Sequence, residues 1–188
     1  MIEAGLDEAG RGPLAGPVYA AAVILDKKNS IVGLNDSKKI SEKNRELIAK
    51  EIKAKAISWS IGASTASEID QFNILRASLL AMKRALECLE VSPDLILVDG
   101  IHAPDTKLIV KTIIRGDQHE KNIMAASIIA KVHRDSYMRE IDSTYPQYGF
   151  KQHKGYPTKK HLEALKSHGI TKEHRLSFKP VRLINESN

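Results

Sequence analysis

Cysteine is almost absent from the sequence, since Cys88 is the only one among 188 residues. A single cysteine excludes an internal disulfide and any zinc site built from several thiolates. Cys88 lies between Leu86 and Leu89, and this apolar setting predicts a small buried residue on a helix. The scarcity of cysteine is consistent with a reducing compartment.

Long hydrophobic runs are missing as well. The longest, Val18–Leu25, falls far short of the roughly 20 apolar residues that a membrane-spanning helix requires. Acidic Glu3 stands close behind Met1, and no basic region leads into an apolar segment, so no secretory signal is visible. We therefore expect a cytoplasmic protein that does not associate with membranes.

Acidic residues are the minority charge, with 23 Asp and Glu against 29 Lys and Arg, which gives a net charge of +6 and a pI near 9.3. A basic surface favours a polyanionic partner such as nucleic acid. With 42% hydrophobic residues in 188, the chain is long enough for one domain with a real core. No internal repeat or long linker divides it.

Hydrophobic periodicity predicts an α/β fold. Five strands are predicted. Apolar runs indicate one that ends near residue 8 and others over Val18–Leu25, Leu95–Val98 and Leu108–Ile114, and period-two alternation over Ile57–Ile61 indicates a strand with one buried face. Apolar stripes at spacings of three and four predict helices over residues 42–55, 65–89, 120–143 and 158–169. Three consecutive strands followed by two strand–helix crossovers predict a five-stranded mixed sheet with helices on its faces. The tail is predicted to lie on the surface with His174, Arg175, Lys179 and Arg182.

Carboxylates stand at the ends of several predicted strands. Asp7 and Glu8 end the first strand, Asp99 ends the fourth, and Asp117 follows the fifth. If the first and fourth strands are parallel neighbours, Asp7 and Asp99 meet. Each acid alone is more simply a solvated loop residue, but their repeated placement favours a shared site for a hard cation. Oxygen ligands select Mg²⁺ or Mn²⁺, and two such ions can hydrolyse a phosphodiester.

Basic and glycine-rich segments accompany these acids. Gly10-Arg11-Gly12 exposes backbone N–H groups and one guanidinium beside the acids, which indicates a phosphate or sugar site. Lys38 is either a solvated charge or a phosphate contact. Lys154 and Tyr156 lie in a basic aromatic loop, where the lysine can meet phosphate and the tyrosine can stack on a sugar or base. A plain loop anchor is the simpler reading of Tyr156.

Seven histidines raise the question of zinc. Their spacing forms no recognised ligand set, and cysteine ligands are lacking, so the sequence does not favour a zinc site. These histidines include His102, His119, His133, His153 and His161.

The ordered motifs resemble those of bacterial ribonuclease HII, the type 2 ribonuclease H, from Asp7 to Val181. They are Asp7-Glu-Ala-Gly-Arg-Gly12, Leu34-Asn-Asp-Ser-Lys-Lys39, Val98-Asp-Gly100, Gly116-Asp117, Ala125–Val132 with Arg134-Asp135, Tyr148–Thr158, and His174-Arg175 leading to Ser177-Phe178. One departure is Arg115, where the family commonly has lysine. The resemblance implies a ribonuclease H-like sheet. It also implies that Asp7, Glu8, Asp99 and Asp117 are the metal-binding catalytic acids, that Gly10-Arg11-Gly12 reads the ribonucleotide, and that Tyr156 stacks beside the scissile junction.

We therefore predict a metal-dependent endoribonuclease that cuts the RNA strand of RNA–DNA hybrids. It should also nick duplex DNA on the 5′ side of embedded ribonucleotides, by two-metal-ion hydrolysis that leaves 3′-hydroxyl and 5′-phosphate ends. We expect a monomer, with residues 1–145 as the catalytic domain and residues 146–188 as a substrate-contacting loop and helical extension. The alternatives are a non-catalytic hybrid-binding module and a DNA junction nuclease of the same architecture.

Overall fold

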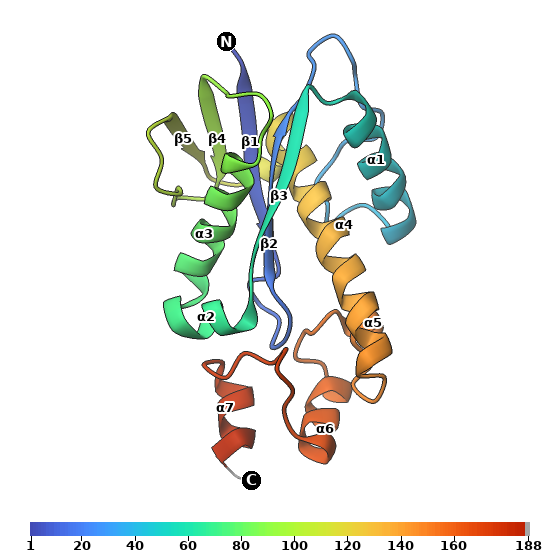
Figure 1. Ribbon diagram of the computed structural model, residues 1–188. Helices are drawn as coiled ribbons and strands as arrows, with labels where there is room; N and C mark the ends of the chain where they lie inside the picture. Colours follow the sequence, from blue (N-terminus) through green and yellow to red (C-terminus); the bar gives the residue numbers. More distant parts are fainter. Residues whose placement is uncertain (187–188) are drawn as a thin grey trace.

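The computed structural model describes residues 1–186. A central sheet is flanked by helices, and the last helices lie below it, at the opposite end of the molecule from the N-terminus (Figure 1). The elements in chain order are β1 (Glu3–Ala9), β2 (Val18–Ile24), α1 (Glu42–Lys55), β3 (Ser58–Ser64), α2 (Ala66–Phe72), α3 (Ile74–Glu87), β4 (Leu95–Asp99), β5 (Ile109–Ile113), the 3₁₀ helix η1 (Gly116–Gln118), α4 (Lys121–Thr144), α5 (Phe150–His153), α6 (Lys159–His168) and α7 (Lys179–Glu186).

The sheet has five strands in the order β3-β2-β1-β4-β5. β1 is antiparallel to β2 and parallel to β4, and β5 continues the parallel half. One core cluster joins the sheet to α3, and another joins it to α1 and α4 on the opposite face. This arrangement confirms the predicted five-stranded mixed sheet covered by helices.

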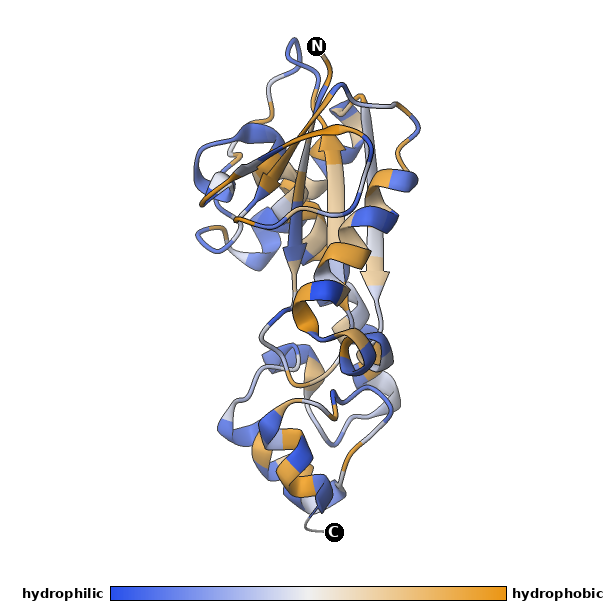
Figure 2. Cartoon of the chain, turned by 90° about the vertical axis from the view of Figure 1, so that its left-hand side faces the viewer, coloured by the Kyte–Doolittle hydropathy of each residue, from blue (hydrophilic) through white to orange (hydrophobic). Residues whose placement is uncertain are grey.

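Small residues let the helices approach the strands closely. A Cβ at Gly5 of β1 would lie 2.1 Å from the backbone of Asn122 in α4, so only glycine fits there. Hydrophobic colour runs along the strands, while the surfaces of the helices are mixed (Figure 2). β3 alternates as predicted, but its buried face carries Ser58, Ser60 and Ser64, and Trp59 is only half-buried. Small side chains are needed on that face because α3 packs directly against it.

The predicted helix over residues 65–89 is two helices. Thr65 caps α2 through a capping box with Glu68, but Asn73 has a φ of 68°, which breaks the helix after Phe72. The Asn73 side chain then accepts a hydrogen bond from the Arg76 N–H and caps α3. The expectation for Cys88 is wrong, because this residue lies just beyond α3 and is exposed.

The C-terminal part has a core of its own, in which α5, α6 and α7 pack against the end of α4. The predicted surface tail is wrong for His174 and Arg175, which are buried, whereas Lys179 and Arg182 are exposed. Charged residues are normally outside, and sequence alone does not show that a guanidinium has backbone carbonyls to bind. Residues 187 and 188 of the predicted extension lie outside the described part of the chain. Between residues 1 and 186, no helix is long and apolar enough to cross a membrane.

Candidate active site

Two neighbouring strands bring the first acids together. Asp7 and Glu8 lie near the C-terminal end of β1, and Asp99 is the last residue of β4. The strands run parallel with Leu6 in register with Val98, so Asp7 and Asp99 lie at the same edge of the sheet. This confirms that the two strands are parallel neighbours, as the predicted meeting of these acids requires.

Asp117 reaches the same edge from β5. The chain turns after the strand at Arg115, whose φ of 55° is left-handed, and η1 follows. The backbone N–H of Asp117 donates to Oδ1 of Asp99 over 3.3 Å. The structure therefore gathers all of the predicted acids at one edge, with Asp7 and Asp117 buried.

The acids are held in an unfavourable electrostatic environment. Burial raises the pKa of Asp7 well above its ordinary value, and the charges of Glu8 and Asp99 raise it further. Burial also raises the pKa of Glu8 and the pKa of Asp99. Grouped carboxylates with raised pKa values gain free energy when a cation neutralises them. The edge therefore favours a bound cation.

Two basic side chains already balance part of this charge. Arg11 Nη1 lies 3.2 Å from Glu8 Oε1, and Lys38 Nζ lies 3.3 Å from Asp117 Oδ2. In this arrangement, no group of three or more His, Cys, Asp or Glu side chains within residues 1–186 is placed to hold a metal ion. The chemistry of the donors nevertheless fits a hard divalent cation, because every acidic group at the edge offers oxygen.

The glycine loop after β1 is held from below by a buried arginine. Arg175 Nη2 donates to the carbonyl oxygen of Gly10 over 2.6 Å, and Nη1 donates to that of Arg11 over 3.0 Å. Its Nε donates to the carbonyl oxygen of Gly16 over 3.0 Å. Burial lowers the pKa of Arg175 to about 9, which still leaves it charged at neutral pH. These bonds fix the loop that the sequence assigns to substrate.

A second buried arginine supports the same loop. Arg134 donates to the carbonyl oxygens of Ala15, Pro17 and Lys154 over 3.0–3.1 Å. It also lies directly under Gly10, where a Cβ would come within 2.0 Å of the guanidinium Nε. Both arginines stand in motifs that carry the family resemblance, but neither was predicted to belong to the site. Their supporting role is not visible in the sequence, because each acts through main-chain atoms that are distant along the chain.

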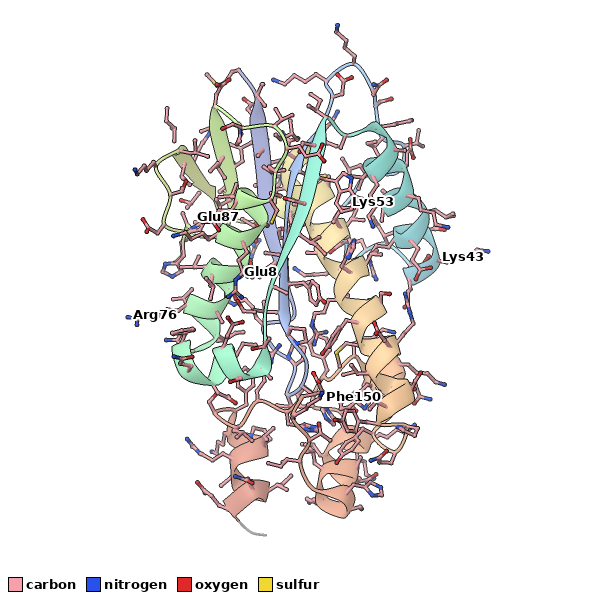
Figure 3. All side chains as sticks on the ribbon, viewed as in Figure 1. Glu8, Lys43, Lys53, Arg76, Glu87 and Phe150 are labelled. Carbon is pink, nitrogen blue, oxygen red and sulfur yellow. The ribbon has the colours of Figure 1, made fainter. Side chains whose placement is uncertain are left out.

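A cavity of about 260 Å³ opens beside the acids. It brings together most of the predicted site residues, namely Asp7, Glu8, Gly10, Arg11, Gly12, Lys38, Asp99 and Tyr156. Its lining also includes Lys131 and Ser127. Ser127 makes a hydrogen bond to the side chain of Asp7, and its Oγ lies 2.9 Å from Ser37 Oγ. Nothing in the sequence beyond its small side chain distinguishes Ser127 as a site residue. Glu8 points from β1 toward the space beside α3 (Figure 3).

The predicted basic and aromatic contacts separate into exposed and buried groups. Tyr156 is exposed, and the Lys38 side chain is 80% exposed, so both are accessible to substrate. Lys154 is buried, its Nζ donates to the carbonyl oxygen of Lys151 over 2.6 Å, and it lies 3.3 Å from a Glu42 carboxylate oxygen. The ammonium of Lys154 is therefore engaged within the protein.

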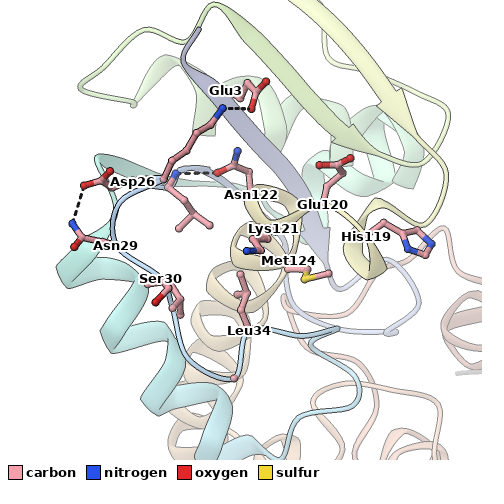
Figure 4. A pocket seen from close by; sticks show the side chains of 14 residues that line it. Glu3, Asp26, Asn29, Ser30, Leu34, His119, Glu120, Lys121, Asn122 and Met124 are labelled. Carbon is pink, nitrogen blue, oxygen red and sulfur yellow. Dashed lines mark hydrogen bonds and ion pairs between the residues drawn. The ribbon is translucent and has the colours of Figure 1, made fainter.

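A larger cavity of about 650 Å³ lies away from these acids, between the segment after β2 and the start of α4 (Figure 4). Glu3 pairs there with Lys27, and Asn122 accepts a hydrogen bond from the Leu25 N–H. Its lining includes neither Asp7 nor Asp99. Volume alone therefore does not identify the functional site.

A five-stranded mixed sheet flanked by helices, with carboxylates gathered at one end of its central strands, defines a nuclease of the ribonuclease H-like class. Among solved structures, the chain is similar to the ribonuclease H2 from Pyrococcus horikoshii OT3, with a TM-score of 0.84 and 27% identity over 100% of this chain and 98% of that one. Bst-RNase HIII, solved in complex with Mn²⁺, shares the fold at a TM-score of 0.74 and 16% identity, over 100% of this chain and 70% of that one.

The family model for Ribonuclease HII matches residues 4–181. Ribonuclease HII from Vibrio campbellii is 55% identical over 97% of this chain and 86% of its own length. The chain belongs to the ribonuclease HII family. This membership confirms the predicted family and fold, and it confirms the predicted activity of an endoribonuclease on RNA–DNA hybrids.

Proposed function

We propose that the chain cuts the RNA strand of hybrids and also nicks duplex DNA on the 5′ side of an embedded ribonucleotide, with Mg²⁺ or Mn²⁺ in a two-ion site. Asp7, Glu8, Asp99 and Asp117 would hold the ions. The observation that carries this proposal is the convergence of these acids at one edge, beside a cavity lined by the glycine loop and Tyr156. We further propose that the enzyme acts as a cytoplasmic monomer.

When bound, the divalent ions supply positive charge that polarises the scissile phosphate and lowers the pKa of water. The reaction is hydrolysis: an oxygen of water bonds to phosphorus, the bond to the 3′-oxygen breaks, and that oxygen takes a proton. The products are a 3′-hydroxyl and a 5′-phosphate on the ribonucleotide. Because water is the nucleophile, the 2′-hydroxyl serves recognition and no cyclic phosphate forms.

Recognition of one ribonucleotide in DNA depends on its 2′-hydroxyl, the group that DNA lacks. Gly10 and Gly12 let main-chain groups approach the sugar, and the bonds from Arg175 hold that main chain in place. Tyr156 is exposed beside Gly12, where a Cβ would lie 3.5 Å from the tyrosine ring. We propose that the ring stacks against the sugar of the following nucleotide.

Phosphate contacts are assigned by exposure. Arg11 and Lys38 are accessible and lie beside the acids, so we propose that both contact the substrate backbone. The buried Lys154 instead holds the loop that carries Tyr156, through Lys151 and Glu42. In this account, residues 1–145 form the catalytic domain, and the segment from residue 146 presents Tyr156 to the substrate.

The test is a cleavage assay on four labelled substrates: an RNA–DNA hybrid, a DNA duplex with one ribonucleotide, an all-DNA duplex and a DNA junction. The proposal expects cleavage of the first two, and a 3′-hydroxyl with a 5′-phosphate on the ribonucleotide. Binding without cleavage would indicate a hybrid-binding module, and cleavage of the junction would indicate a DNA nuclease. A 2′,3′-cyclic phosphate, or a cut on the 3′ side of the ribonucleotide, would contradict the proposed chemistry.

A further inference from the structure

Three buried or half-buried histidines lie under the loop that carries Tyr156. The rings of His153 and His161 stack with centroids 4.5 Å apart, and the rings of His161 and His174 are 5.3 Å apart. They pack around Phe150, which is labelled between the sheet and the C-terminal helices in Figure 3. None of them belongs to the carboxylate edge, so hydrolysis gives them no role.

The hydrogen-bond partners of these histidines determine which ring nitrogen donates and which accepts. The Thr171 backbone N–H donates to Nδ1 of His174 over 2.9 Å, so this nitrogen is the acceptor. In a neutral imidazole the other nitrogen carries the proton, so Nε2–H of His174 donates to Nε2 of His161 over 3.1 Å. By the same logic, Nδ1–H of His161 donates to the carbonyl oxygen of Tyr156 over 3.0 Å. A chain of hydrogen bonds therefore runs from Thr171 to Tyr156.

His153 holds the same loop one residue earlier. The backbone N–H of Gly155 donates to its Nδ1 over 3.1 Å, so its Nε2–H donates to the carbonyl oxygen of Tyr148 over 2.8 Å. Gly155 is bonded in turn to the glycine loop, because its carbonyl oxygen accepts from the N–H of Leu14 over 2.8 Å. The main chain at Tyr156 is thereby tied both to the histidines and to the loop after β1.

This series of hydrogen bonds from Thr171 to Tyr156 can form only when the imidazole rings of His161 and His174 are neutral. A protonated imidazole has two donors and no acceptor, so His174 could no longer accept from Thr171, and His161 could no longer accept from His174. Burial lowers the pKa of His161 to about 4 and that of His174 to about 3, in keeping with neutral rings.

We propose that His161 and His174 are positioning residues, which set the main chain at Tyr156 and thereby the tyrosine ring that selects a ribonucleotide followed by DNA. The inference rests on the proposed function, because it requires Tyr156 to contact the substrate. It adds that selection for the single-ribonucleotide junction depends on a hydrogen-bond chain that begins at Thr171, outside the cavity beside the acids.

Two amide substitutions at His161 test its two hydrogen bonds one at a time. In His161→Asn, the amide nitrogen can occupy the place of Nδ1 and still donate to the Tyr156 carbonyl. In His161→Gln, the amide lies at the place of Nε2, so it can meet His174 but not Tyr156. His168→Gln is the matched control, because His168 lies exposed on the same helix and takes no part in the chain.

The measured quantity is the ratio of kcat/KM on the single-ribonucleotide duplex to kcat/KM on the continuous hybrid. His161→Gln should lower this ratio about fivefold to tenfold, which is the effect of about one net hydrogen bond. His168→Gln should keep the ratio, and His161→Asn, which retains the bond to Tyr156 but loses the bond to His174, should lower it by a smaller factor than His161→Gln does. In a Tyr156→Ala background, His161→Gln should lower it no further, because residues that act through one another are not additive.

The two proposals fail in different ways. If Tyr156→Ala leaves the ratio at the wild-type value, the proposed role of Tyr156 is wrong and the positioning role falls with it. If Tyr156→Ala lowers the ratio but His161→Gln does not, or if Asn and Gln lower it equally, only the positioning role is overturned. NMR of the wild-type imidazole nitrogens needs no variant: a proton on Nδ1 of His161 and on Nε2 of His174 is expected, and the opposite tautomers would overturn the chain.

Discussion

The carboxylate edge and the histidine cluster both bury titratable groups, but they do so with opposite results. At the edge, burial and like charge raise the pKa of Asp7, and part of the negative charge is left for an outside partner. In the cluster, each donor meets an acceptor, and the pKa of His161 is lowered to about 4 mainly by burial. The first region is arranged to bind an ion, whereas the second is complete within the protein and supports a loop.

The largest expected effect comes from removing one acid. Asp99→Asn should lower cleavage of the hybrid by more than about 100-fold at saturating Mg²⁺, because even residues that only support a ligand cost 10–100-fold. Asp105→Asn is the control, since this acid lies in the loop after β4 with its side chain 98% exposed. Steady-state rates of the two variants give the comparison. Near-normal turnover of Asp99→Asn would remove Asp99 from the site.

Two glycines of the same loop should respond differently to alanine. Gly10→Ala places a Cβ against Arg134 at a φ of 100°, so the free energy of unfolding should fall by roughly 2 kcal/mol or more. Gly12→Ala meets only ordinary contact with Tyr156, and a change within about 0.5 kcal/mol is expected. Chemical denaturation measures both. Equal losses would show that Arg134 does not restrict the loop.

The opposite pKa shifts predict opposite responses of stability to acid. His161 and His174 have lowered pKa values, so their contribution is present above pH 6.5 and is lost as pH falls towards 4. The slope should approach about 1.4 kcal/mol per pH unit for each histidine that stays neutral in the native state. Asp7 acts in the other direction, because burial first and like charges second raise its pKa, so protonation removes a buried and repelled charge and stabilises the fold.

Stability measured from pH 8 to pH 5 in chelator should therefore fall with acid, and His161→Asn should make the fall shallower. The charges of Lys160 and Asp142 also act on His153 in the histidine cluster. Lys160→Gln therefore serves as a control for the effect of a nearby charge. A wild-type stability that rises steadily towards pH 5 would show that the acids outweigh the histidines.

The smallest effect concerns one exposed lysine. Hybrid binding should weaken steeply as salt increases, because bound basic groups release counterions from the phosphates. Lys38→Ala should reduce the magnitude of the slope of log K against log salt by about one. The buried Lys154 gives the contrast, since its ammonium is engaged by Lys151 and Glu42. Fluorescence anisotropy over a range of salt gives both slopes, and identical slopes for Lys38→Ala and wild type would exclude the contact.

Much of the fold and the acidic site could be predicted because their signals are local. Strand periodicity places Asp7 and Asp99 at strand ends, and the parallel pairing of β1 with β4 then brings them to one edge. The support of the loop could not be predicted. The bond from Arg175 to Gly10 joins residues 165 positions apart, and a basic residue in a tail is ordinarily at the surface.

The helix break at Asn73 escaped prediction for a different reason. The apolar stripe continues through it, and only the positive φ shows that the chain turns there. The exposure of Cys88 escaped prediction for the same reason, because hydrophobic periodicity does not show where α3 ends. Apolar residues spaced three and four apart therefore predict which face of a helix is apolar more reliably than where the helix begins or ends.

The central claim is that the acids of the sheet edge bind divalent ions, and Mn²⁺ binding tests it most directly. Electron paramagnetic resonance would follow free Mn²⁺ during titration of the wild type, Asp99→Asn and the control Asp105→Asn, without substrate. The wild type and Asp105→Asn should bind Mn²⁺ with the same affinity, and Asp99→Asn should bind it at least about tenfold more weakly. Equal affinity in all three proteins would contradict the account.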